Sequence, residues 1–240
     1  MQVIGFIGYV NKTDFMISIA KMLTICGKKV LMMDGTSEQR LNYTMPSIEG
    51  KSQAHIANYD GLYGAVNYDS LGHFEKYVTE RNINIDEYDY MIVDIDNQQS
   101  YQEFRKRGFD KLFFFFDHSP MSVEKNLEIL KAMFNFKLPE QEIKMTKVIS
   151  KLYVSRLSEE FFENKFGEYE VVWEREPIEY PLEITDTVQS IENSYSGIIE
   201  YKKYSQGFKN AAIEISSILL GEMNLNLVKK TLKQYERRKR

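Results

Sequence analysis

The chain has 240 residues and a formal net charge of −4, with 43% hydrophobic and 28% charged residues. This length and composition suffice for one sizeable hydrophobic core and are typical of a globular protein. The acidic balance argues against broad nucleic-acid binding, so we do not expect direct contact with DNA. The single cysteine, Cys26, excludes an intramolecular disulfide and suits a reducing compartment.

The first ten residues, MQVIGFIGYV, predict a β-strand and not a signal peptide. They are apolar but short, carry no basic segment, and run directly into Asn11 and Lys12. No later stretch reaches the apolar length that is needed to cross a bilayer. We therefore expect a cytoplasmic protein.

Short apolar runs then alternate with segments of helical periodicity. The predicted strands are 3–7, 30–33, 90–93, 112–116, 147–149 and 171–173. The predicted helical segments are 14–29, 71–82, 122–134, 157–166 and 205–222. This alternation predicts a single doubly wound α/β domain with a mostly parallel sheet of about seven strands.

Two regions along this pattern need an interpretation of their own. The four phenylalanines Phe113–Phe116 fit a central strand buried on both faces better than an exposed binding patch, because polar residues bound the run on each side. The region 38–69 is rich in Gly, Tyr and Asn. We expect it to be largely loop, with one short strand near residues 55–58.

The C-terminal segment 222–240 is basic. It contains seven Lys/Arg and two Glu, a charge of +5 that leaves −9 on the remaining chain. Apolar residues recur in it at spacings of three and four: Leu225, Val228, Leu232 and Tyr235. Such a helix can lie on an anionic membrane, at its inner face, or dock on the body with a frayed basic end. We favour docking, because the stripe is narrow and lacks Trp and Phe. We divide the chain into an α/β domain, 1–221, and a basic helix or tail, 222–240.

Ligands of doubly wound sheets bind at the carboxyl ends of the strands, and three such ends carry suitable residues. Lys12 and Thr13 follow the first strand where a helix begins, as in a phosphate-binding loop. Asp34 and Asp94 each follow an apolar strand, where a carboxylate reaches Mg²⁺ directly or through water. The alternatives are a solvated lysine at a helix start and ordinary acidic residues at loop starts.

In this order and spacing the segments resemble the MinD/ParA family of deviant Walker-A P-loop ATPases, from Val3 to about Gly221. The family loop reads K-G-G-x-G-K-[ST]-[ST], and Lys12 and Thr13 match it. YDYMIVD, ending at Asp94, resembles the family's Walker-B strand. The resemblance implies ATP or ADP with Mg²⁺ as cofactor, Thr13 and Asp94 at the metal, and Asp34 in catalysis. It implies a nucleotide-binding loop made of Gly8, Tyr9, Val10, Asn11, Lys12, Thr13 and Asp14.

The loop departs from the family at several positions. Tyr9 and Asn11 replace glycines, and a tyrosine side chain would occupy the space where backbone approaches phosphate, at a position expected to need positive φ. Ile7 replaces the signature lysine, whose charge crosses the family's dimer interface. Asp14 replaces a Ser/Thr and would place negative charge close to a bound phosphate.

Recognition and hydrolysis of the nucleotide are affected as well. Thr36 replaces the second acid of a D-x-D motif, and Ser150 and Lys151 stand where an adenine-reading Asn often occurs. The sequence therefore predicts weak or lost nucleotide binding on a degenerate Walker A loop.

The leading functional hypothesis is a divergent, TadZ/CpaE-like positioning or scaffold factor for a membrane, pilus/secretion or partition machinery. Its expected partners are proteins of that machinery, and a homodimer is a further expectation. The alternative is an active MgATP-dependent dimeric switch ATPase for DNA partitioning or membrane localisation. A third interpretation is an unrelated α/β enzyme with its site in Asn58–Asp69. The three histidines are dispersed, so no zinc site is expected.

Overall fold

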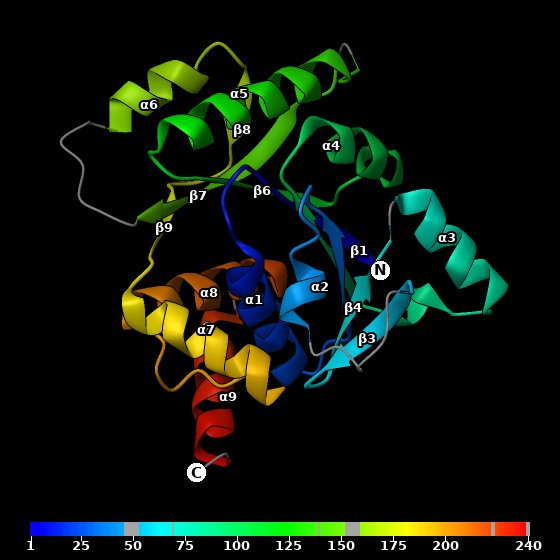
Figure 1. Cartoon of the computed structure of the whole chain (residues 1–240). Helices are drawn as coiled ribbons and strands as arrows, with labels where there is room; N and C mark the ends of the chain where they lie inside the picture. The colour runs from blue at the N-terminus through cyan, green and yellow to red at the C-terminus, as the bar shows by residue number, and fades with distance from the viewer. Residues whose placement is uncertain (46–52, 69, 139, 152–158, 222–223, 239–240) are drawn as a thin grey trace.

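The fold is built around one twisted sheet (Figure 1). The computed structural model describes residues 1–45, 53–68, 70–138, 140–151, 159–221 and 224–238. The strand order is β3-β4-β2-β5-β1-β6-β7-β8, with β9 also paired to β7. All pairs are parallel except β3–β4. The predicted α/β class and mostly parallel sheet are confirmed, with nine strands described where about seven were expected.

The strands alternate along the chain with the helices that cover them. The strands are β1 Gln2–Ile7, β2 Val30–Gly35, β3 His55–Tyr59, β4 Leu62–Val66, β5 Tyr90–Ile95, β6 Lys111–Phe116, β7 Ile143–Lys151, β8 Val171–Trp173 and β9 Ile178–Pro181. The helices are α1 Thr13–Ile25, α2 Leu41–Thr44, α3 Leu71–Glu80, α4 Gln98–Phe104, α5 Pro120–Asn135, α6 Glu159–Phe166, α7 Ile184–Ser196, α8 Gln206–Leu219 and α9 Leu225–Arg238. Two short 3₁₀ turns, Ile85–Glu87 and Arg105–Arg107, complete the described elements.

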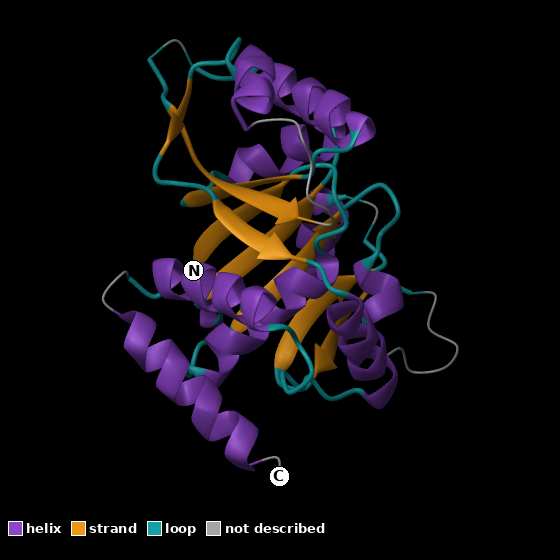
Figure 2. Cartoon of the chain, turned by 90° about the vertical axis from the view of Figure 1, so that its left-hand side faces the viewer, coloured by secondary structure: helices purple, strands orange, loops and turns teal. Residues whose placement is uncertain are grey.

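Helices cover both faces of the sheet, so central strands are buried on both sides (Figures 1 and 2). Phe113 and Phe115 of β6 belong to the apolar cluster shared with α1, α8 and α9, whereas Phe114 and Phe116 belong to the opposite cluster under α3, α4 and α5. This alternation follows from the two-residue period of a strand. The predicted buried strand is confirmed.

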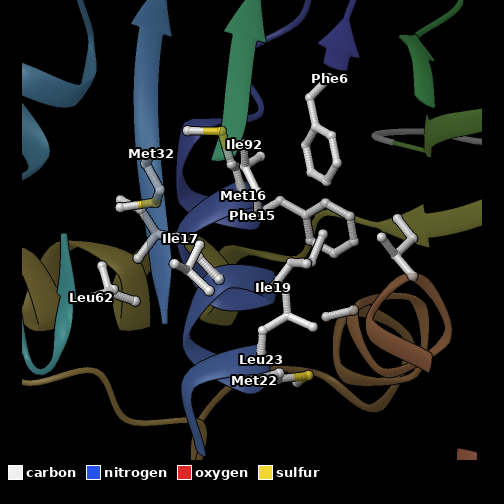
Figure 3. Close-up of a cluster of buried hydrophobic side chains, with 14 of the residues drawn as sticks. Phe6, Phe15, Met16, Ile17, Ile19, Met22, Leu23, Met32, Leu62 and Ile92 are labelled. Carbon is white, nitrogen blue, oxygen red and sulfur yellow. The ribbon is translucent and has the colours of Figure 1, made fainter. Parts of the chain in front are cut away.

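Helix α1 packs on the face of the sheet formed by β2, β4 and β5. Its residues Phe15, Ile19 and Leu23 are fully or almost fully buried and recur at helical spacing. Figure 3 shows these side chains in one cluster with Phe6 of β1 and Ile92 of β5. The packing fixes the start of α1 at the carboxyl edge of the sheet, where ligands of this fold class bind.

The region 38–69 contains more regular structure than expected. The strand predicted near 55–58 is β3, and β4 completes a hairpin with it through Asp60 and Gly61, at φ 49° and 89°. Asp-Gly is a strong signal for such a turn, and the sequence prediction missed it. Residues 46–52 and Asp69 lie outside the described residues. Of the region Asn58–Asp69, which was considered as the site of an unrelated α/β enzyme, the structure therefore describes Asn58 to Tyr68.

The C-terminal helix docks on the body, as the sequence predicted. Val228 and Leu232 of α9 are buried in the α1/α8 cluster, and Tyr235 packs against it. Three of the four residues of the predicted apolar stripe therefore pack inside the protein, while Leu225 is 37% exposed. In the part of the chain that is described, no helix has the length and apolarity required of a membrane span.

Candidate functional site

The loop from β1 to α1 passes so close to β6 that it requires glycine at its first position. Gly8 has φ +141°, and a Cβ atom there would lie 1.9 Å from the carbonyl oxygen of Phe115. The expectation of positive φ at Tyr9 was wrong. The described non-glycine residues with positive φ are Gln39, Asp60, Asn67 and Asn82. Tyr9 therefore sits in the loop without that strain.

The ammonium of Lys12 is held entirely by the protein. Its Nζ lies 2.6 Å from Asp94 Oδ1 and donates to the carbonyl oxygens of Gly8, at 2.7 Å, and Ile95, at 3.2 Å. The side chain has no exposed surface. A lysine ammonium has three protons, and these three acceptors match that number. Lys12 is thus a buried cation with a complete set of internal partners, not a solvated lysine.

Thr13 completes the contacts of Asp94. The Thr13 hydroxyl donates to Asp94 Oδ2 at 3.1 Å, while Oδ1 faces Lys12. Both residues are almost fully buried. The two predicted metal ligands, Thr13 and Asp94, therefore lie together, as a magnesium site would require. The carboxylate of Asp94, however, is already paired with the ammonium of Lys12.

Asp34 organises the loop that follows β2. One carboxylate oxygen accepts from the backbone N–H and the hydroxyl of Thr36, at 2.8 and 2.6 Å, and the other accepts from the N–H of Leu41 at 2.6 Å. Burial, followed by the nearby charge of Asp94, raises the pKa of Asp34 to about 6. These contacts give Asp34 a structural role, and its catalytic role stays a prediction.

Arg40 is a second cation at this edge, and the sequence analysis missed it. Its Nη1 approaches the carbonyl oxygen of Val10 at 3.5 Å, and its Nη2 lies 3.8 Å from Asp96 Oδ2. Its Nε donates to Glu38 at 2.9 Å. The other oxygen of Asp96 accepts from the N–H of Ser37 at 2.9 Å. The available signal was an arginine shortly after a strand-ending aspartate, which is weak without the fold.

The side chain of Asn126, on α5, accepts a hydrogen bond from a backbone N–H group of the loop. This fully buried side chain accepts from the N–H of Tyr9 at 2.8 Å and donates to the carbonyl oxygen of Phe115 at 3.2 Å. A phosphate-binding loop depends on N–H groups that converge on the anion, and one of them is committed here. No sequence motif pointed to Asn126.

Asp14 lies half-buried in the first turn of α1, and its effect on a bound phosphate stays a prediction. Burial raises the pKa of its carboxyl group, and a hydrogen bond with Ser190 of α7 opposes that rise. Asn11, in contrast, is exposed at the loop surface.

In this structure, groups of the loop that would face a magnesium nucleotide are bonded to other protein groups. Oxygen ligands of the kind that Mg²⁺ prefers are present at Thr13 and Asp94. The position beside Asp94, however, is filled by the Lys12 ammonium, and the N–H of Tyr9 is bound to Asn126. Within the described ranges, no group of three or more His, Cys, Asp or Glu residues is placed to hold a metal ion.

The comparisons with known proteins concern the fold. No protein-family model matches the chain, and no curated protein matches its sequence. The chain is similar in structure to a ParA family ATPase from Chlorobium tepidum, with a TM-score of 0.61 and 15% identity over 89% of this chain and 96% of that one.

Two further solved structures support the same fold. MinD in the MinC:MinD complex of Aquifex aeolicus gives a TM-score of 0.58 and 19% identity, over 90% and 96% of the two chains. The ATP complex of Cyanothece McdA gives a TM-score of 0.52 and 13% identity, over 90% and 96%. The protein therefore has a MinD/ParA-like fold, as the sequence predicted.

Proposed function

We propose that this protein is a divergent MinD/ParA-like positioning or scaffold factor in which nucleotide is a weak or lost regulator. The observation that carries the proposal is the complete set of protein partners around Lys12. In this interpretation the Lys12 ammonium stabilises the loop without a bound nucleotide. Its charge neutralises Asp94, and it donates a hydrogen bond to the carbonyl oxygen of Gly8. The degenerate Walker A motif fits this role, since Ile7, Tyr9 and Asn11 depart from the family pattern.

The partners of such a factor are proteins. The similar MinD structure is a complex with MinC, which supports a partner protein for this chain as well. We assign residues 1–221 to the P-loop-like domain and 222–240 to an appended basic helix. Candidate machineries are those expected from the resemblance: a membrane, pilus or secretion assembly, as for TadZ/CpaE-like proteins, or a partition system.

Membrane contact through α9 would use its lysines together with Leu225 and Leu227, which are 37% and 52% exposed. Val228 and Leu232 are buried, whereas Lys229, Lys230 and Lys233 are exposed. We expect a cytoplasmic protein that does not sediment with vesicles containing anionic phospholipid at physiological salt. Sedimentation that is lost when the three lysines are changed to glutamate would establish peripheral attachment instead.

Calorimetry tests the proposal for the nucleotide. We expect wild-type protein to bind ATP and ADP, in the presence of Mg²⁺, with a dissociation constant above about 0.1 mM or not at all. Tight, Mg²⁺-dependent binding that Lys12→Ala abolishes would contradict the proposal. Lys21→Ala is the matched control, because Lys21 is likewise a buried, ion-paired lysine but lies within α1, outside the loop.

The alternative is an active MgATP-dependent switch ATPase. The convergence of Thr13, Asp94 and Asp34 at one edge favours it, because a P-loop ATPase needs these residue types there. This alternative requires Lys12 to exchange the carboxylate of Asp94 for phosphate. The same titration decides between the two functions.

A further inference from the structure

Helix α7 has its polar side inward and its apolar side outward. Ile184, Val188, Ile191 and Tyr195 are 85%, 42%, 52% and 91% exposed. Buried instead are Asp186, Gln189, Ser190 and Asn193. A surface helix ordinarily has the reverse arrangement, with its apolar stripe facing the core. Figure 1 draws α7 in yellow on the outer side of the molecule.

Hydrogen bonds on the inner side fix this orientation. Asp186 accepts from the N–H groups of Glu183, at 2.9 Å, and Ser205, at 2.6 Å. Gln189 accepts from the N–H of Lys203 at 3.0 Å. Asn193 donates to the carbonyl oxygen of Glu200 at 3.0 Å. Rotating the helix to bury its apolar stripe would break these bonds and leave the backbone groups of Ser205, Lys203 and Glu200 without their partners on α7.

The exposed stripe has the spacing of a helix-pairing seam. Ile184, Val188, Ile191 and Tyr195 follow one another at intervals of four, three and four residues, and Ile198, 43% exposed, continues the pattern beyond the helix end. Alternation of three and four is the heptad pattern by which two helices pack along each other. An apolar stripe with this period is suited to another helix.

The flanks of the seam favour a second copy of the same helix. The positions beside it are Thr185, Thr187, Glu192 and Ser194. Glu192 is the acid among them, and its carboxylate is bound by Lys203 at 2.6 Å. Two copies therefore meet without strong repulsion between like charges. An anionic membrane is disfavoured, because α7 contains no lysine or arginine and exposed Glu183 precedes it.

We propose that α7 pairs with α7 of a second copy across a two-fold axis, forming a homodimer that needs no nucleotide. An identical, self-complementary patch is what a two-fold interface requires. One short helix pair lies at the low end of interface sizes, so the dimer is weak, with a dissociation constant in the micromolar range, about 1–100 µM. The proposal goes beyond the proposed function and does not depend on the state of the P-loop.

Sedimentation velocity of the full chain without nucleotide, from about 1 to 200 µM, tests the pairing. Wild type should shift from monomer to dimer as concentration rises. Ile191→Glu should weaken the dimer at least about tenfold, because it places a charge in the seam. Met121→Glu is the matched control, since Met121 is 61% exposed on helix α5, and it should dimerise as wild type does.

Each other outcome overturns the proposal. Wild type that stays monomeric over the whole range excludes the second copy as occupant of the stripe. A dimer that Ile191→Glu leaves unchanged uses another surface. Flotation of wild type, but not of Ile191→Glu, with vesicles of anionic phospholipid would assign the stripe to a membrane. Circular dichroism of both variants checks that substitution at these exposed positions has preserved the fold.

Discussion

Helix α1 is associated with two buried lysines, each paired with an aspartate from a distant part of the chain. Lys12 precedes the helix and lies 2.6 Å from Asp94, while Lys21 lies within it, 2.9 Å from Asp60. Both also donate to backbone carbonyl oxygens. The Lys12 pair is 0% and 1% exposed, whereas Asp60 of the second pair is 22% exposed.

The surroundings of the two pairs differ more than their geometry. Asp60 also accepts hydrogen bonds from Tyr235 of α9 and from the N–H of Ile199, so that pair fastens the C-terminal helix to the hairpin turn. The Lys12 pair instead lies at the carboxyl edge of the sheet with Asp34 and Thr13. Burial and pairing with an aspartate, which Lys12 and Lys21 share, therefore do not by themselves indicate a ligand-binding site. The prediction of a phosphate site at Lys12 depends on its place at the strand ends.

The largest expected effect comes from removing each lysine in turn. Lys12→Met should lower the free energy of unfolding by about 3–5 kcal/mol, because it leaves the buried charge of Asp94 without its partner. Lys21→Met should cost less, about 2–3 kcal/mol, since Asp60 retains contact with water and with Tyr235. Urea denaturation measures both values.

The control for these lysines is an exposed pair. Lys28 lies 3.4 Å from Asp89, with both side chains about 40% exposed. Lys28→Met should change the free energy of unfolding by less than about 1 kcal/mol. If Lys12→Met matched this control, Lys12 would not be a structural cation.

The next largest effect concerns Asp34, which lies beside the Lys12–Asp94 pair. Its titration should make the stability of the protein depend on pH. Burial and Asp94 raise the pKa of Asp34 from 3.8 to about 6, so the folded state binds a proton more tightly than the unfolded state. The free energy of unfolding should therefore fall as pH rises from about 4 to 6, by at most about 3 kcal/mol from this group.

Denaturation at several pH values, on wild type and Asp34→Asn, measures that contribution. The variant should lose most of the decline between pH 4 and 6. Asp86→Asn, at an exposed position, should retain it. An unchanged slope in Asp34→Asn would remove Asp34 as its source.

The smallest expected effect concerns the fastening of α9. Tyr235→Phe removes a hydroxyl that donates to Asp60 at 3.1 Å and lies 2.9 Å from the carbonyl oxygen of Ile199. We expect a loss of about 1–2 kcal/mol, because two neighbouring acceptors lose a partner while the ring keeps its packing. Thermal unfolding of this variant beside Tyr195→Phe, whose ring is 91% exposed, provides the comparison. Equal melting temperatures would contradict the fastening role.

Several elements were predicted from the sequence by their apolar pattern, and others were missed. The α/β class, the buried Phe113–Phe116 strand and the docking of α9 followed from the positions of apolar residues. Helix α7 was missed although Ile184, Val188, Ile191 and Tyr195 have helical spacing, and the hairpin was missed at Asp60-Gly61. Strand β9 is a four-residue run ending at Pro181, too short for a periodic signal.

The sequence predicted where the candidate site lies, but not the hydrogen bonds and ion pairs that its residues make. Strand ends placed Lys12, Thr13, Asp34 and Asp94 together, because parallel strands share one carboxyl edge. The sequence does not show that Lys12 bonds to Asp94 or that Asn126 binds the N–H of Tyr9. Such contacts arise from residues far apart in the chain, and neither belongs to a motif.

A double-mutant cycle on Lys12 and Asp94, without nucleotide, tests most directly whether the lysine is held as a structural cation. The variants are Lys12→Met, Asp94→Asn and the double substitution, each measured by urea denaturation. We expect a coupling of about 1–3 kcal/mol, with the double variant more stable than the sum of the single losses implies. Additivity within about 0.5 kcal/mol, with Lys12→Met close to wild type, would contradict it and leave Lys12 available for phosphate.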